Sequence, residues 1–178
     1  MTENQTSIRG LVYAALFGAL TAAGAFIVIP LPPVPITAQT FFMNVAALLL
    51  GGTLGALSQI VYIMLGVVGL PVFAGGKAGL GILFGPTGGY LAGFVLAAFV
   101  IGTVNRLKNN PGMLWHIFSM LIGMCLIYLL GISWLAFTAK MSFQKALAVG
   151  ALPFIPGDLL KIALAALVSF KLKDRIKL

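Results

Sequence analysis

The chain has 178 residues, of which 61% are hydrophobic and 8% charged, with a formal net charge of +8. A soluble domain carries about 25% charged residues, so these charges are too few to cover a water-facing surface. No Asp, Glu, Lys or Arg occurs between Arg9 and Lys77, whereas one membrane-spanning helix needs only about 20 apolar residues. The composition therefore predicts an all-α integral membrane protein and argues against a water-soluble domain.

Prolines and glycines divide the apolar sequence into six expected spans. PLPPVP (residues 30–35) ends the first span, because proline lacks an N–H and restricts the residue before it. GGT (residues 51–53) ends a short second span. A glycine-rich stretch precedes the fourth span, and the polar turn NRLKNNPG follows it. The expected spans lie near residues 10–29, 36–50, 54–70, 85–105, 113–138 and 156–172.

Residues 1–178 are therefore expected to form a single six-helix transmembrane domain with both termini on one side. Basic residues indicate which side, because cytoplasmic segments carry an excess of Lys and Arg. One side would hold Lys77, Lys140 and Lys145, and the other Arg9, Arg106, Lys108, Lys171, Lys173, Arg175 and Lys177. This asymmetry predicts cytoplasmic N- and C-termini. The basic residues are thus explained by the orientation of the chain in the membrane. No nucleic acid partner is expected.

The stretch from Gly66 to Gly93 is unusually rich in glycine. Glycine allows positive φ angles and close approach of the backbone to a ligand or a helix. The spacing does not match a P-loop, because Lys77 is followed by alanine and lacks the earlier glycine. Tight helix packing is one interpretation of this stretch. A loop that folds over a bound molecule is favoured for four of its glycines, Gly75, Gly76, Gly79 and Gly81.

Small residues recur every four positions in the first span, at Ala15, Ala19 and Ala23. Such a row makes a flat helix face that another helix can approach closely. Two interpretations remain open, namely packing within this protein and docking to a separate membrane subunit.

Candidates for catalysis are scarce. His116 has no second His or Glu nearby in the sequence, so it predicts no metal site and is expected at the membrane interface. Tyr62 is expected as an interfacial anchor or a core residue. Gln39 brings an amide near the outer mouth, where it would either bind a ligand or satisfy a neighbouring backbone group. The sequence therefore predicts neither an enzyme nor a cofactor site.

Asp158 and Lys161 are opposite charges inside an otherwise apolar stretch, FIPGDLLKIALAALVSF. Charges within membrane spans are costly and usually mark a substrate or ion path. Residues three apart share one helix face, and Pro156 suits a first helical turn, where the helix dipole favours a carboxylate. A mutually neutralising structural pair is one interpretation. The other is a site for a small ligand that bears both N–H and C=O groups, such as a urea.

Three segments together resemble the BioY family, the biotin-binding S components of energy-coupling factor (ECF) vitamin transporters. They are PLPPVPITAQTFF, LGVVGLPVFAGGKAGLGILFGPTGGYLAGF and GALPFIPGDLLK, and the resemblance extends over nearly the whole chain. It implies a multi-pass plasma-membrane protein with an outward-facing vitamin pocket. It also implies a transmembrane scaffold subunit and two cytoplasmic ATPase subunits as partners.

The resemblance further implies that Asp158 and Lys161 contact the polar head of biotin, while the loop of Gly75, Gly76 and their neighbours closes over it. Tyr90 and Gln39 are weaker carry-overs. Lys77 departs from the small or neutral residue expected in that loop, and it would reach either the ligand's carboxylate or the lipid surface. The alternative functions are a proton-coupled secondary carrier that uses Asp158 and a purely structural membrane subunit.

Overall fold

The computed structural model describes residues 7–173 and 175. This part of the chain is mostly helical, as the all-α prediction requires, and adds one short two-stranded hairpin. The elements in chain order are α1 (Ile8–Phe26), β1 (Val28–Ile29), β2 (Ile36–Thr37), α2 (Gln39–Leu50), α3 (Gly52–Val67), α4 (Gly81–Phe84), α5 (Gly88–Arg106), α6 (Met113–Thr138), α7 (Phe143–Gly150) and α8 (Ile155–Leu172).

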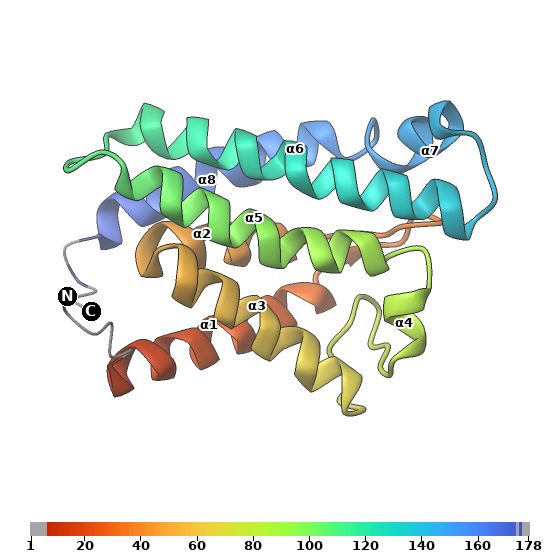
Figure 1. The fold of residues 1–178 in the computed structure, drawn as a ribbon, viewed down its shortest axis with the longest axis horizontal. Coiled ribbons are helices and arrows are strands. Elements are labelled where there is room, and N and C mark those ends of the chain that lie inside the picture. The colour runs from red at the N-terminus through yellow and green to blue at the C-terminus, as the bar shows by residue number, and fades with distance from the viewer. Residues whose placement is uncertain (1–6, 174, 176–178) are drawn as a thin grey trace.

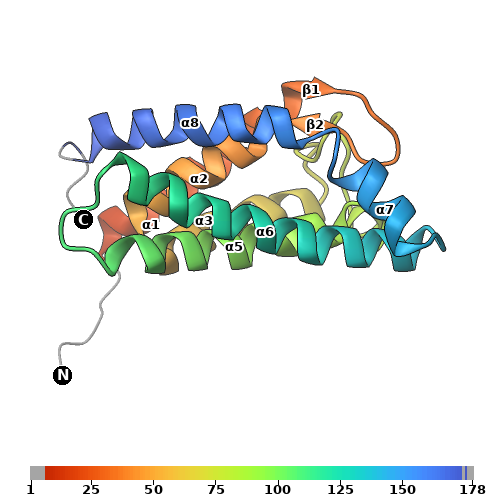
Figure 2. The ribbon, with the colours of Figure 1, turned by 90° about the horizontal axis from the view of Figure 1, so that it is seen from above.

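The long helices run along the long axis of an elongated bundle (Figure 1). The start of α1, the α5–α6 turn and the end of α8 lie at one end of the bundle. Helices α4 and α7 lie at the other end (Figure 1), together with the short β1–β2 hairpin (Figure 2). Helix α2 is central, because it packs against α1, α3, α5 and α8, and its side chains from Met43 to Leu48 are buried. This arrangement places the loops at the two ends of the bundle.

Three helices of the described residues, α1, α5 and α6, are long and apolar enough to cross a membrane. Helices α7 and α8 add a fourth span if the pair, bent by 52°, is counted as one. Helix α2 has 12 residues and α3 has 16, which correspond to about 18 and 24 Å at a rise of about 1.5 Å per residue. Both are shorter than a hydrocarbon core of about 30 Å, so the count of six spans stays a prediction.

The structure corrects the boundary between the first two expected spans. Helix α1 ends at Phe26, although its span was expected to continue to about residue 29. Val28 and Ile29 instead pair with Thr37 and Ile36 in an antiparallel hairpin. The second span was expected from residue 36, but its helix begins at Gln39. The β-branched residues on both sides of the proline-rich loop favour extended backbone, which makes this short strand pairing the better local structure.

The connection between the fifth and sixth expected spans also differs from the prediction, because it contains α7. Ser142 caps this helix by accepting a hydrogen bond of 3.3 Å from the backbone N–H of Lys145. The chain then turns sharply into α8. A helix of eight residues is too short for apolar periodicity to reveal it reliably.

The predicted break at GGT is confirmed, and the tertiary structure gives its reason. Gly51 has a φ of 83°, which disfavours residues with a side chain. Arg106 of α5 reaches this turn and donates a 2.8 Å hydrogen bond to the carbonyl of Leu50. A Cβ added at Gly102 would lie 2.3 Å from backbone atoms of Gly51 and Gly52. Glycines therefore allow α5 to cross directly over the α2–α3 turn.

His116 was expected at the membrane interface, and its level in the membrane stays a prediction. Its side chain is only 2% exposed, and its ring meets the ring of Phe170 edge-on at a centroid distance of 6.3 Å. Helix packing thus places His116 between α6 and α8, where it fills space in the protein interior.

Candidate ligand-binding site

A cavity of about 240 Å³ lies at the end of the bundle that carries the β1–β2 hairpin and α4. Its apolar wall includes Val34, Phe73, Ile82, Leu91, Phe94, Ile127 and Phe154. Its polar wall is formed by Thr37, Gln39, Thr40, Tyr62, Lys77, Thr87, Tyr90, Tyr128, Asp158 and Lys161. A mainly apolar pocket with a few convergent polar groups is typical of small-molecule sites.

Asp158 and Lys161 are brought together as predicted and line this cavity. Lys161 Nζ lies 2.9 Å from Asp158 Oδ1, and the two side chains are 17% and 13% exposed, respectively. Pro156 lies in the first turn of α8 and Asp158 follows it in the same turn, which the helix dipole makes favourable for a carboxylate. Both charges therefore face the same partly enclosed space at the beginning of α8.

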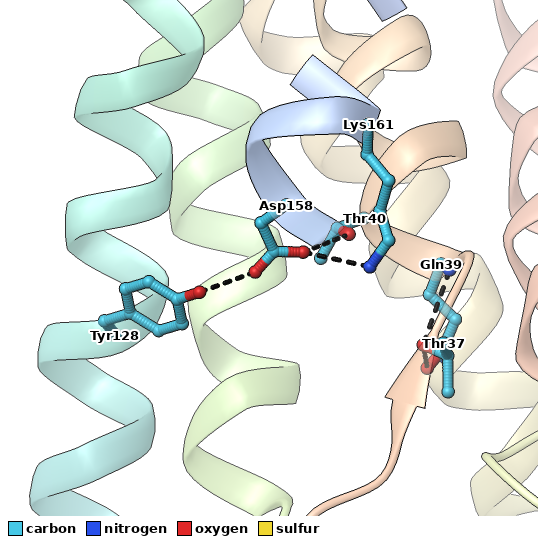
Figure 3. Close-up of polar contacts among 6 residues, drawn as sticks. All are labelled: Thr37, Gln39, Thr40, Tyr128, Asp158 and Lys161. Carbon is cyan, nitrogen blue, oxygen red and sulfur yellow. Dashed lines mark hydrogen bonds and ion pairs between the residues drawn. The ribbon is translucent and has the colours of Figure 1, made fainter. Parts of the chain in front are cut away.

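Two further residues hold the Asp158 carboxylate (Figure 3). The Tyr128 hydroxyl of α6 donates a 2.6 Å hydrogen bond to Oδ2, and the Thr40 hydroxyl of α2 donates a 3.3 Å bond to Oδ1. Lys161 approaches from the side opposite Tyr128. Donors from α2, α6 and α8 thus compensate the carboxylate for lost contact with water. A carboxylate has about four acceptor positions, so it retains capacity for a ligand N–H.

Gln39 belongs to a second polar group at the first turn of α2. Its Oε1 accepts a 2.7 Å hydrogen bond from the Thr37 hydroxyl, and its Nε2 donates to the hydroxyl of Tyr62 on α3. Gln39 is 4% exposed and Tyr62 is fully buried. Gln39 therefore lies at the cavity as predicted, and its amide is oriented from both sides.

Tyr90 also lines the cavity, but its hydroxyl serves a different contact. The hydroxyl donates a 2.8 Å hydrogen bond to the carbonyl of Gly150 and thereby joins α5 to the end of α7. A Cβ added at Gly131 would lie 2.4 Å from the Tyr90 ring. The glycine at position 131 thus makes room for the ring of this cavity-lining residue.

The four glycines predicted to contact a ligand are not among the residues that line the cavity. Gly75 and Gly76 have a φ of 73° and Gly79 has a φ of 92°, so they shape the turns of the loop. Gly81 begins α4. The lining residues from this loop include Phe73, Ala74 and Lys77. Glycine here positions its neighbours, and closure of the loop on a ligand stays a prediction.

The loop is anchored to α3 at two points. The Gly79 N–H donates a 2.8 Å hydrogen bond to the carbonyl of Gly66. The ring of Phe73 inserts beside Gly66, where an added Cβ would lie 2.2 Å from it. It also meets the Tyr62 ring edge-on at 5.7 Å. Phe73 is the buried residue that fixes the loop next to the cavity.

The row of Ala15, Ala19 and Ala23 on α1 is exposed in this chain. The neighbouring row of small residues, Ala14, Gly18 and Ala22, is buried instead. Gly18 packs closely on α3, since an added Cβ would lie 2.9 Å from the carbonyl oxygen of Ser58. Internal packing therefore uses the second row and leaves the first row free in the isolated chain.

The sequence analysis missed four residues of the polar wall, namely Thr37, Thr40, Thr87 and Tyr128. Tyr128 lies in the middle of an apolar helix and 30 positions from Asp158, so no local spacing links the two. Thr37 and Thr40 flank Gln39 in the short polar cluster ITAQT, which was the one available signal. Tyr62 was expected as an anchor or core residue; it is buried in the core, and it also lines the cavity.

The fold and the cavity define a multi-pass helical membrane protein that encloses a small-molecule site at one end. The model of the BioY family matches residues 1–178. The chain belongs to the BioY family.

Relatives and a solved structure agree over nearly the whole length. The "Biotin transporter BioY" of Thermotoga maritima is 45% identical over 166 residues, covering 93% of this chain and 96% of the relative. The "Probable biotin transporter BioY" of Pyrococcus horikoshii is 43% identical, covering 89% and 93%. The crystal structure of the "S-component for biotin from an ECF-type ABC transporter" superposes with a TM-score of 0.87. It is 31% identical and covers 98% of this chain and 95% of that chain.

Proposed function

We propose that this chain is the biotin-specific S component of an ECF-type, ATP-driven vitamin importer. The observation that carries the proposal is the Asp158–Lys161 pair, which lines an otherwise mainly apolar cavity in a member of the BioY family. The names of the relatives support biotin as the ligand, and the name of the solved structure supports the ECF setting.

The chemistry of biotin is complementary to this cavity. Its cyclic urea offers N–H groups to the Asp158 carboxylate and a carbonyl oxygen to the Lys161 ammonium. Its apolar bicycle matches aromatic residues such as Phe73 and Phe94. Its carboxylated tail would extend toward Lys77, which is the cation that the glycine-rich loop adds to the cavity. Gln39 and Tyr90 complete the proposed substrate-binding set.

The glycine-rich loop is proposed to close over bound biotin. Gly75, Gly76, Gly79 and Gly81 are exposed or only partly buried, and three of them have positive φ angles that few other residues adopt. Addition of biotin should slow hydrogen exchange in residues 75–81. Unchanged exchange in that segment, with binding confirmed in the same sample, would indicate a static packing role.

The membrane arrangement proposed here has six spans within the single domain 1–178 and cytoplasmic termini. Helices α2 and α3 would be short crossing elements, and α7 would lie at the outer end, where the cavity opens. The exposed row of Ala15, Ala19 and Ala23 would dock the transmembrane scaffold subunit. Two cytoplasmic ATPase subunits would supply the energy for uptake.

Two measurements test the function. Purified protein in nanodiscs should bind biotin in a one-to-one ratio by calorimetry. Cells that contain the scaffold and ATPase subunits should take up biotin in an ATP-dependent manner, and uptake should persist after a protonophore abolishes the proton gradient. Absence of binding would contradict the ligand assignment. Uptake that stops with the proton gradient while ATP is maintained would favour a secondary carrier instead.

A further inference from the structure

A second, much smaller cavity lies next to the ligand cavity. It has a volume of about 20 Å³, and Thr40, Tyr128 and Asp158 line both cavities. The polar residue that only the small cavity has is Asn44 of α2. Apolar residues complete its lining, namely Met124, Ile127 and Ile162. Asp158 and the two hydroxyl groups that hold it are therefore bordered by a second space, which contains an amide.

The small cavity extends one helical turn from Asp158 toward the middle of the bundle. Asn44 follows Thr40 by four residues on α2, and Ile162 follows Asp158 by four residues on α8. Residues four apart share a helix face, and both helices run inward from the end that carries the hairpin (Figure 2). Asn44 is 5% exposed. Its amide is thus an interior polar group beside the contacts of Asp158.

The direction of the hydrogen bonds to Asp158 determines what this space can hold. The hydroxyls of Tyr128 and Thr40 each donate to the carboxylate. A hydroxyl carries one proton, so each of these oxygens can only accept a further hydrogen bond. The amide of Asn44 supplies two N–H donors at the other side of the cavity.

The volume and the lining suit one water molecule. A buried water needs about 10–15 Å³ of space and about two to four polar partners. The cavity offers about 20 Å³, with Asn44, Thr40 and Tyr128 as partners. A cation is disfavoured, because the ammonium of Lys161 lies 2.9 Å from Asp158 Oδ1 and already compensates the negative charge.

We infer that one buried water occupies this cavity, accepts a hydrogen bond from the Asn44 amide and donates to the hydroxyl oxygens of Tyr128 and Thr40. Its two protons fix both hydroxyls as donors to Asp158, and hydrogen bonds in such a series strengthen one another. The water occupies no acceptor position of the carboxylate, which stays open to a ligand N–H. Asn44 is thereby a positioning residue that acts on Asp158 through the water. The effect on affinity rests on the proposed biotin-binding function, whereas the water itself does not.

Two variants of equal shape test the role of Asn44. Asn44→Val offers no donor to the water, whereas Asn44→Thr has the same shape and retains a hydroxyl. Asn44→Val should weaken biotin binding about three- to tenfold, the range for loss of one ordinary hydrogen bond. Asn44→Thr should bind clearly more tightly than Asn44→Val. Calorimetry measures both affinities, and thermal midpoints show whether each variant is folded.

A combined variant and a control complete the series. Tyr128→Phe removes one of the two hydroxyls through which the water acts. Asn44→Val combined with Tyr128→Phe should therefore weaken binding by less than the product of the two single losses. The matched control is Asn105→Val, at an asparagine of α5 that is also 5% exposed and lies outside the lining of both cavities. Its biotin affinity should equal that of the parent.

A high-resolution crystal structure of the ligand-free protein tests the water directly. It should show one water within hydrogen-bond distance of Asn44, Thr40 and Tyr128, and a dry cavity would overturn the inference. Equal losses in Asn44→Val and Asn44→Thr would assign Asn44 a packing role and overturn it as well.

Biotin affinity should be the same in sodium chloride and in choline chloride, and a requirement for sodium would assign the cavity to a cation instead. If the parent protein does not bind biotin, the proposed function fails, while the crystal structure still decides whether the water is present.

Discussion

Tyr128 on α6 donates a hydrogen bond of 2.6 Å to Oδ2 of Asp158 on α8 and so joins two helices at the cavity wall. The remaining carboxylate oxygen receives Thr40 and Lys161. Asp158 is therefore held by donors on three helices, which fixes the direction of its free acceptor position before a ligand enters. This relationship makes Tyr128 a positioning residue of the proposed site.

Replacement of Tyr128 by Phe should weaken biotin binding by roughly tenfold, because a hydrogen bond to a charged group contributes about 1.5–3 kcal/mol. Calorimetry on the purified variant measures this loss. The thermal midpoint distinguishes a positioning role from a general loss of structure. Biotin affinity equal to that of the parent would show that the Asp158 carboxylate does not need the Tyr128 hydroxyl.

Substitutions of the charged pair test the site directly. Asp158→Asn places an amide where the ligand N–H needs an acceptor, and Lys161→Met removes the donor to the carbonyl while keeping the side-chain length. Each should weaken biotin binding by at least roughly tenfold, or about 1.4 kcal/mol. Lys145→Gln, on the exposed face of α7, is a matched loss of positive charge and should leave affinity unchanged. If both variants fold and bind like the parent, the pair is structural.

Lys77 should distinguish biotin from biotin amide. The residue lines the cavity from the exposed side of the glycine-rich loop, so a contact with the ligand's carboxylate would be partly screened by water. Lys77→Gln should reduce the affinity for biotin by about two- to fivefold, in keeping with about 0.2–1 kcal/mol for exposed ion pairs. The affinity for the amide should not change. An equal loss for both ligands would contradict a contact with the carboxylate, and unchanged affinity for both would direct Lys77 to the lipid surface.

Replacement of Ala19 by Trp should separate binding from uptake. Ala19 is exposed on α1, and a large side chain there would prevent close approach of a partner helix. Uptake by the complete transporter should be abolished, while biotin binding to the isolated chain should persist. Leu129→Trp on the exposed side of α6 is the control. Loss of binding together with uptake would mean that the Ala19 face packs internally.

Single cysteines test the orientation of the chain in the membrane. With the exposed Cys125 replaced by alanine, Lys108→Cys marks the turn between α5 and α6, and Ala78→Cys marks the glycine-rich loop. A membrane-impermeant maleimide added outside intact cells should label position 78 and leave position 108 unlabelled. Labelling of both positions, or of position 108 alone, would contradict cytoplasmic termini.

Much of the architecture was predictable because it depends on local chemistry. The absence of charge between Arg9 and Lys77 requires a membrane environment. The sequence GGT ends a helix because Gly51 adopts a positive φ. Asp158 and Lys161 meet because residues three apart share a helix face. The cavity-lining position of Tyr90 followed only from the family resemblance, whereas Gln39 was also expected near the outer mouth from its place in the second span.

The sequence by itself thus determined the membrane environment, the main helix breaks and the charged pair, whereas the tertiary structure decided which residues meet that pair. Tyr128 and Thr40 come from two different helices, α6 and α2, and their positions depend on how each helix is rotated. Hydropathy does not reveal this rotation, because in lipid a side chain facing the membrane is as apolar as one facing the core. The two rows of small residues on α1 were indistinguishable in the sequence for the same reason. The row that contains Gly18 is buried, and the row that contains Ala19 is exposed.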